Sequence, residues 1–259
     1  MARCVWRSAS AGPKRIVPDG CLDLVVGDGG VFIAGPDTAA WSSVTRPGAE
    51  LRGVRFRPGH APAVLGVAAD ELRDRRVSLG ELWGPAGEVL AERLLAGELS
   101  PAEAVASRLP EAGPADRAVA ELIERLDAGA ARVAEARLAR GQADPARTKV
   151  QSGSSRLSPD LAAIRLEEPS AVSERRLRRR FVQAVGYGPA TYLRVARFQR
   201  AVALAPRVPG LAALAVAAGY SDQAHLSRDC RALTGLTPRG YFTPPSTVDA
   251  AERDRLRSA

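Results

Sequence analysis

The feature that most restricts the fold of this 259-residue sequence is an internal repeat with an offset of 49 residues. Each copy follows the pattern L-x-R-x-(F/C)-x4-G-x2-P-x2-Y, from Leu177 to Tyr192 in the first copy and from Leu226 to Tyr241 in the second. Self-similarity at a fixed spacing indicates a supersecondary unit that occurs more than once. The sequence therefore predicts two related helical units in its last third.

The second copy indicates what this unit is. Apolar residues recur at helical spacing over residues 211–218, and Gly219 suits the left-handed backbone of a tight turn. Ser221 or Asp222 can then cap the helix that follows. The apolar face of that second helix consists of Leu226, Cys230 and Leu233. Two short helices joined in this way are typical of a helix-turn-helix, whose second helix enters the major groove of DNA.

These residues carry a resemblance to a known family. The segment from Leu214 to Tyr241 resembles the second helix-turn-helix of AraC/XylS-type transcription regulators, and the segment from Val172 to Pro189 resembles the first. The resemblance implies two tandem helix-turn-helix units joined by a long helix at about residues 189–205, which read two successive major-groove segments on one face of double-stranded DNA. It also implies RNA polymerase as a partner.

The N-terminal half shows a second, less specific resemblance. The segments Pro18–Leu24 and Arg55–Gly59 are similar to an uncharacterised domain that is fused to some members of this family. In the better-known members this position holds a β-barrel that binds an effector or dimerises. The resemblance therefore implies control by a small-molecule effector, whose identity stays open, as does the formation of a homodimer.

The first helix-turn-helix departs from the family pattern. The offset of 49 residues places its scaffold helix at residues 162–169, where Glu168 and Pro169 fit a helix badly. Residues 133–141 are a better-shaped candidate, which requires an insertion at residues 141–170. Two further alternatives are a distorted first unit and a unit that a distant segment completes. A degenerate regulator with weak DNA binding is the corresponding functional alternative.

Charge is distributed unevenly along the chain. Residues 171–241 hold 12 basic and three acidic residues, a net charge of +9, whereas residues 1–110 hold 13 of each and are neutral. The formal charge of the whole chain is +8. A neutral half joined to a basic half indicates a sensing or assembly domain joined to a nucleic-acid-binding domain.

Candidate DNA-contacting residues lie at the start of the two second helices. Arginine can pair bidentately with guanine or neutralise a phosphate, and glutamine can pair with adenine. For the arginine run the alternative is a solvated face, and for His225 it is packing. The candidates are Ser173, Glu174, Arg175, Arg176, Arg178 and Arg179 in the first unit, and Asp222, Gln223, Ala224, His225, Ser227 and Arg228 in the second.

The expected fold class is α+β, with a β-rich N-terminal domain that also contains helices and an all-α C-terminal domain. Strands are expected at residues 22–26, 31–34 and 51–56, and helices at 61–109, 116–126 and 171–241. The expected domains are a sensing or dimerisation domain at 1–110, connecting helices and a linker at 111–170, the DNA-binding domain at 171–245 and a flexible tail at 246–259.

Neither an enzyme nor a cofactor is expected. Cys4, Cys21 and Cys230 are far apart and the only histidines are His60 and His225, so the sequence predicts no metal site. The enzymatic alternative is a DNA-repair alkyl acceptor that uses Cys4 or Cys21, but such chemistry needs an activated thiolate. No membrane segment or signal peptide is evident, so the expected location is the cytoplasm, at the nucleoid.

Two groups near the N-terminus admit two interpretations each. Asp19 and Asp23 flank Cys21 and are expected to serve the turn before a strand, rather than to form a polar pocket. Cys21 itself is expected to be a buried small hydrophobe. The tryptophans, Trp6, Trp41 and Trp83, are expected to pack in the core rather than to line an effector site.

The charge distribution yields a first prediction. The affinity for duplex DNA should fall with salt, with a log–log slope of about −0.9 for each phosphate contact, because binding releases condensed counterions. Titration of the protein against its best duplex at several salt concentrations measures this slope. A slope near zero would contradict the electrostatic assignment of residues 171–241.

Overall fold

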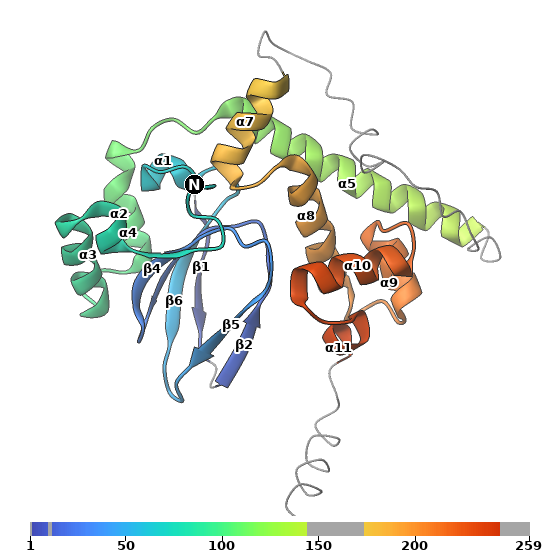
Figure 1. Cartoon of the computed structure of the whole chain (residues 1–259), viewed down its shortest axis with the longest axis horizontal. Coiled ribbons are helices and arrows are strands. Elements are labelled where there is room, and N and C mark those ends of the chain that lie inside the picture. Colours follow the sequence, from blue (N-terminus) through green and yellow to red (C-terminus); the bar gives the residue numbers. More distant parts are fainter. Residues whose placement is uncertain (1, 10–11, 144–173, 244–259) are drawn as a thin grey trace, which may run out of the picture. The chain divides into compact units, whose positions relative to one another are not determined.

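The computed structural model describes residues 2–9, 12–143 and 174–243, and the described chain divides into two compact units (Figure 1). Unit 1 contains residues 2–9, 12–129 and 174–196, and unit 2 contains residues 130–143 and 197–243. Strands occur early in the chain and helices occupy the rest, so the expected α+β class is confirmed. The proposed tail at 246–259 and nearly all of the proposed insertion lie outside the described residues.

Unit 1 is built on two antiparallel sheets. The larger sheet has the strand order β1 (Ala2–Ser8), β6 (Leu51–Phe56), β3 (Asp23–Gly27), β4 (Gly30–Ala34) and β7 (Arg76–Ser78). The smaller sheet pairs β2 (Gly12–Ile16) with β5 (Trp41–Thr45). The three strands expected from the sequence correspond to β3, β4 and β6, and the tight turn between β3 and β4 pairs Gly27 with Gly30.

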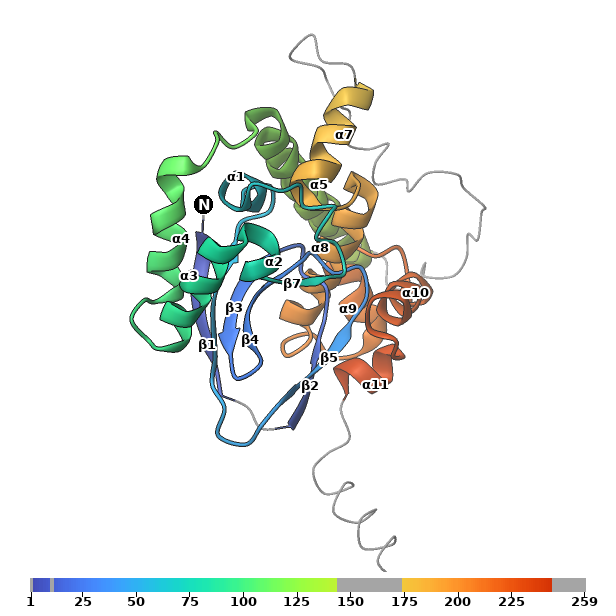
Figure 2. The same cartoon turned by 60° about the vertical axis from the view of Figure 1, so that its left-hand side comes forward.

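Alternation along the strands gives the larger sheet two different faces. Leu24 and Ile33 are buried in the hydrophobic core on one face, whereas their neighbours Val25 and Phe32 line a cavity on the other. Helices cover the core face (Figure 2): α1 (Ala61–Leu65), α2 (Leu79–Trp83), α3 (Pro85–Leu95) and α4 (Pro101–Arg108). A short 3-10 helix, η1 (Leu109–Glu111), follows α4.

Two of these helices begin with complete capping boxes. Ser78 accepts a hydrogen bond from the backbone N–H of Glu81, whose carboxylate accepts one from the backbone N–H of Ser78. Ser100 and Glu103 form the same reciprocal pair at the start of α4. Each box satisfies donors that the first helical turn leaves free, so α2 and α4 begin where the sequence places Ser-x-x-Glu.

Two long helices, α5 (Arg117–Ala143) and α8 (Pro189–Leu204), each contribute residues to both units. The helix expected at residues 116–126 is present, but it continues to Ala143. Its expected apolar face is buried: Val119, Leu122, Ile123 and Leu126. The long connecting helix expected at 189–205 is confirmed as α8.

Unit 2 contains a helix-turn-helix formed by α9 (Leu211–Ala218) and α10 (Gln223–Thr234), followed by α11 (Pro238–Phe242). Gly219 between α9 and α10 adopts φ +90° and Asp222 caps α10, as the sequence predicts. The core of this unit includes Leu214, Ala215, Tyr220 and Leu226.

The structure explains the internal repeat. In both copies the glycine, Gly186 or Gly235, has a positive φ directly after a helix, where a side chain would be strained. The proline that follows, Pro189 or Pro238, begins the next helix, where its missing N–H costs nothing. The repeat therefore encodes a helix, its left-handed end and the start of the next helix.

The compact units do not coincide with the domain ranges expected from the sequence. The helix α7 (Glu174–Val185) and the first half of α8 belong to unit 1, although both fall within the range 171–245. The physical reason is that the end of α7 packs on the N-terminal part of the chain, where the backbone N–H of Ala69 donates to the carbonyl of Gln183. Whether residues 1–110 and 171–245 fold independently stays a prediction.

A glycine in unit 1 provides a stability test. A Cβ at Gly35 would lie 1.6 Å from the carbonyl oxygen of Leu72, whereas a Cβ at Gly29 would meet no atom within 4 Å. Gly35→Ala should therefore lower the free energy of unfolding by at least about 2 kcal/mol, because backbone must move to admit the methyl group. Urea denaturation of the full chain measures the effect, with Gly29→Ala as the matched control. Equal stability of the two variants would contradict the packing of Gly35.

Candidate functional site

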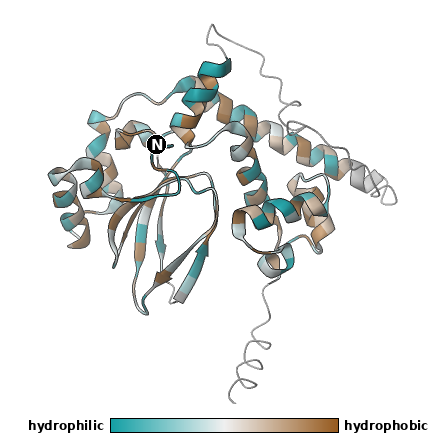
Figure 3. Ribbon diagram, viewed as in Figure 1, coloured by the Kyte–Doolittle hydropathy of each residue, from teal (hydrophilic) through white to brown (hydrophobic). Residues whose placement is uncertain are grey.

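The arginine run of the first repeat copy forms the exposed N-terminal half of α7. Glu174, Arg175, Arg176, Arg178 and Arg179 are all exposed, and this part of the helix is hydrophilic in Figure 3. The C-terminal half of the same helix is buried at Phe181, Ala184 and Val185. The described candidates of the first unit therefore share one accessible surface, while Ser173 lies outside the described residues.

The last turns of α7 are fixed to the N-terminal part of unit 1. The Nε of Arg180 donates a hydrogen bond to Oδ2 of Asp116 over 2.6 Å. The backbone N–H of Ala69 donates to the carbonyl of Gln183 over 2.7 Å. Arg180 closes the arginine run in the sequence, yet its partner is a carboxylate of the same unit. This residue anchors the helix, which its position in the run does not reveal.

The turn after α7 also packs closely against the N-terminal part of unit 1. Arg73 donates from Nη1 to the carbonyl of Gly186 over 3.2 Å. A Cβ on Gly186 would lie 2.3 Å from Cγ of Pro36 and 3.1 Å from the carbonyl oxygen of Ala69. Gly186 also has φ +96°. Only glycine satisfies both the conformation and the space at this position.

Tyr187 follows Gly186, and its side chain lies close to Gly20. The Tyr187 side chain is buried, and its hydroxyl lies 3.4 Å from the position that a Cβ on Gly20 would take. This hydroxyl has no hydrogen-bond partner among the described residues. Burial, and then the nearby Asp19 and Cys21, raise the pKa of Tyr187. The hydroxyl is therefore protonated at neutral pH.

In unit 2 the candidate residues occupy the N-terminal half of α10. Asp222 accepts a hydrogen bond from the backbone N–H of His225 over 2.7 Å, and this bond is the main reason why the pKa of Asp222 is lowered. Gln223, Ala224 and Arg228 are exposed. Ser227 is half-buried and donates its hydroxyl proton to the carbonyl of Gln223. Asp222 thus stabilises the start of the helix on which Gln223 and Arg228 are displayed.

His225 is part of a polar cluster beneath α10. Its Nε2 lies 3.2 Å from Nη1 of Arg197, and its ring packs edge-on against Tyr220. Arg197 is buried, lies over the Tyr220 ring and is 3.9 Å from a carboxylate oxygen of Asp229. The sequence does not reveal this role of Arg197, because nothing in its spacing distinguishes it from the neighbouring arginines. The packing interpretation of His225 agrees with these contacts.

The scaffold-helix candidate at residues 133–141 is helical and lies within α5. A Cβ on Gly219 would be 3.3 Å from Cβ of Ala134, and Arg137 donates a hydrogen bond to the carbonyl of Gly219. Arg200 of α8 donates to the carbonyl of Ala130 over 2.9 Å. This segment therefore supports the turn of the second helix-turn-helix. The other candidate, residues 162–169, lies outside the described residues.

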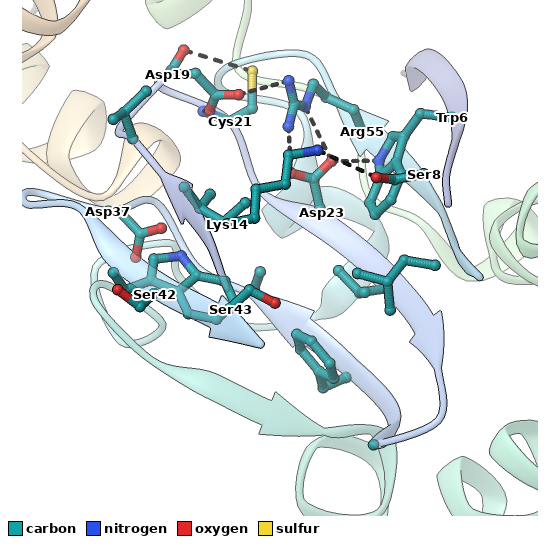
Figure 4. Close-up of a pocket in the computed structure, with 18 of the residues that line it drawn as sticks. Trp6, Ser8, Lys14, Asp19, Cys21, Asp23, Asp37, Ser42, Ser43 and Arg55 are labelled. Atoms are coloured by element: carbon teal, nitrogen blue, oxygen red, sulfur yellow. Dashed lines mark hydrogen bonds and ion pairs between the residues drawn. The ribbon is translucent and has the colours of Figure 1, made fainter. Parts of the chain in front are cut away.

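Unit 1 contains a cavity of about 690 Å³ lined by the larger sheet, by β2 and by β5. At one end, shown in Figure 4, the Arg55 guanidinium pairs with Asp19 at 2.6 Å and with Asp23 at 2.9 Å. Trp6 donates from its indole Nε1 to Asp23 over 3.0 Å. Asp19 also accepts from the backbone N–H of Cys21, which is the expected turn interaction. The same carboxylates thus serve the turn and line a polar pocket end.

The cavity changes the interpretation of two tryptophans. Trp6 of β1 and Trp41 of β5 line the cavity and do not pack in the core. Trp83 packs against the core as expected and donates from its indole Nε1 to the carbonyl of Leu65 over 3.0 Å. Two of the three tryptophans therefore belong to a candidate ligand site.

The three cysteines are free thiols that differ in exposure. Cys21 is buried, and burial, followed by the nearby Asp19, raises the pKa of its thiol to about 12. Cys230 is buried in unit 2, and Cys4 is exposed. Over residues 2–9, 12–143 and 174–243, no group of three or more His, Cys, Asp or Glu side chains could hold a metal ion. None of the helices in those ranges is long and apolar enough to cross a membrane.

Comparison with protein families identifies both ends of the chain. Residues 168–243 match a family described as a helix-turn-helix domain, of the AraC type, and residues 2–78 match a family described as a domain of unknown function (DUF6597). No curated protein and no solved structure matches the chain. The chain therefore joins an AraC-type helix-turn-helix domain to an N-terminal DUF6597 domain, which is the make-up of an AraC-type DNA-binding transcription regulator with an uncharacterised N-terminal domain.

Proposed function

We propose that this regulator reads two adjacent DNA segments, one through α7 and one through α10, and that a small molecule bound in the cavity of unit 1 controls the reading by α7. One observation carries the proposal above all others. The helix with the arginine run is fixed to the compact unit that contains the cavity, while α10 belongs to the other unit.

The two helices present different chemistry to DNA. The α7 surface carries four arginines and one acidic residue, Glu174, so it suits phosphates and guanine edges. The α10 surface presents Gln223 and Arg228, which suit adenine and guanine edges. In α10 the neighbouring cap and polar cluster hold the helix in place. We therefore assign sequence readout to both helices and the larger electrostatic share to α7.

Effector control follows from the connection between the cavity and α7. Asp19 and Cys21 line the cavity, and a Cβ on Gly20, which lies between them, would be 3.4 Å from the hydroxyl of Tyr187 in the turn after α7. Since protein interiors are closely packed, a ligand that shifts the Asp19–Cys21 turn also shifts Tyr187. RNA polymerase and a second copy of the chain complete the proposed partners, and the cytoplasm is the proposed location.

A second candidate is a degenerate regulator with weak DNA binding. The observation in its favour is the close fit of Gly186 against Pro36 and Ala69, which fixes α7 to unit 1. If α7, held in this position on unit 1, cannot enter a DNA groove, only α10 makes specific contacts with DNA. The two candidates differ in the number of DNA segments that contribute to affinity.

Substitutions on the two helices test the proposal. Gln223→Ala and Arg228→Ala should weaken binding and relax sequence preference in one half of the selected site, and Arg175→Ala and Arg178→Ala in the other half. Each good base contact should contribute about 1–3 kcal/mol. Fluorescence anisotropy on the best selected duplex, and on duplexes with either half scrambled, measures both effects.

The matched control for this experiment is Arg93→Ala, which removes an exposed arginine of α3. It should leave the affinity for every duplex unchanged. If the α7 variants bind all duplexes as the unchanged protein does, while the α10 variants lose affinity, the degenerate regulator is correct. If neither pair of variants alters binding, the assignment of both helices is wrong.

The cysteine-based alkyl acceptor, in the form that uses Cys21, is tested separately. Because Cys21 and Cys230 are buried and the pKa of Cys21 is about 12, a maleimide at neutral pH should modify Cys4 alone in the native protein. Intact-mass measurement should show one adduct, and Cys4→Ser should show none. Rapid native modification of Cys21 would contradict its inert environment and would restore the alkyl acceptor as a candidate.

A further inference from the structure

The cavity of unit 1 has mainly apolar walls. Its volume of about 690 Å³ falls in the range of sites for small molecules. The apolar side chains come from both sheets and from the segments between them, and the rings of Trp6 and Trp41 add to them. These apolar lining residues are Ile16, Val17, Val25, Phe32, Ala34 and Val44.

The charged residues of the cavity neutralise one another. Those that are not exposed are already paired, since Arg55 binds Asp19 and Asp23, and Asp37 receives two hydrogen bonds of 2.8 Å from Arg76. Acidic and basic lining residues are equal in number: Asp19, Asp23, Asp28 and Asp37 against Arg7, Lys14, Arg46 and Arg55. Away from the exposed lining residues Arg7, Lys14, Asp28 and Arg46, a ligand with a net charge would therefore meet only side chains whose charge is already paired.

The protonation behaviour of the carboxyl groups agrees with this balance. Burial is the main cause that raises the pKa of Asp19 and of Asp37, in spite of their arginine partners. Even the existing negative charges are thus poorly solvated in this environment. An anionic ligand would add to that cost, and a cationic ligand would have to compete with Arg55 and Arg76 for their carboxylates.

We propose that the cavity binds an uncharged, largely apolar small molecule that carries hydrogen-bonding groups. The hydroxyls of Ser42 and Ser43, which lie opposite the Arg55 end in Figure 4, provide uncharged hydrogen-bonding groups on the β5 side. The apolar body of the ligand would lie against Phe32 and Val25 of the larger sheet. This inference rests on the proposed effector control, for which it specifies the class of ligand.

A pair of fluorescent probes with the same rings tests the class of ligand. N-phenyl-1-naphthylamine is uncharged, and 1-anilinonaphthalene-8-sulfonate adds one negative charge to the same scaffold. Titration of the full chain without DNA should give a single site for the uncharged probe, with a dissociation constant at least tenfold lower than that of the sulfonate. An analogue with a trimethylammonium group in place of the sulfonate should also bind at least tenfold more weakly than the uncharged probe.

Two variants locate the site. Ala34→Phe places an aromatic ring in the cavity and should weaken the uncharged probe at least tenfold. Val5→Phe is the matched control, because Val5 is exposed and lines a different, shallow apolar groove beside α4. This control should bind the probe as the unchanged protein does. Loss of binding in Val5→Phe alone would place the probe in that groove and overturn the proposal.

A third variant tests the balance of charge. Arg55→Gln leaves Asp19 and Asp23 without their cation, so the trimethylammonium probe should gain affinity relative to the uncharged probe, whereas Arg55→Lys should keep the original order. Equal or tighter binding of either charged probe to the unchanged protein would overturn the proposal. Because DNA is absent, such a result would leave the half-site measurements, and with them the assignment of α7 and α10, unaffected.

Discussion

The close fit of Gly186 against the N-terminal part of the chain is the constraint on which the position of α7 in unit 1 depends. A positive φ and the approach of Pro36 and Ala69 together exclude any side chain there. Arg180 and Gln183 add polar contacts on the preceding turns of α7. The arginine surface of α7 is consequently part of the compact unit that holds the cavity, so the proposed ligand site and this proposed DNA-binding surface belong to one packed unit.

The second constraint is the ion pair of Arg55 with Asp19 and Asp23. It joins the segment Pro18–Leu24 to Arg55 at the end of β6. These residues belong to the two segments that carried the resemblance in the N-terminal half. The pair is half-buried, so removing one partner would leave a charge with little water around it. The ion pair lies at the end of the cavity, beside the turn that contains Gly20. Gly20 in turn lies close to Tyr187. A structural ion pair is therefore next to the proposed route from the ligand to α7.

The second helix-turn-helix is stabilised by different means. Arg137 of α5 and Ala134 contact the turn at Gly219, and the buried Arg197 of α8 lies beside His225 of α10. The match to the helix-turn-helix family runs across residues 168–243, although its two halves belong to different compact units. The segment that matches this family thus contains α7, which is fixed by the N-terminal part of the chain, and α10, which is supported by α5 and α8.

The sequence by itself determined the local structure of the repeat. Gly186, Gly219 and Gly235 mark left-handed turns, and Asp222 caps α10, because backbone conformation and capping depend on a few neighbouring residues. The short apolar runs at residues 22–26 and 31–34, with the glycine-rich turn between them, likewise predicted β3 and β4. Only the tertiary structure decided that Arg180 binds Asp116, that Trp6 and Trp41 line a cavity, and that residues 133–141 support the second unit. These contacts join residues far apart in the chain, and no local pattern records which distant surface a side chain will meet.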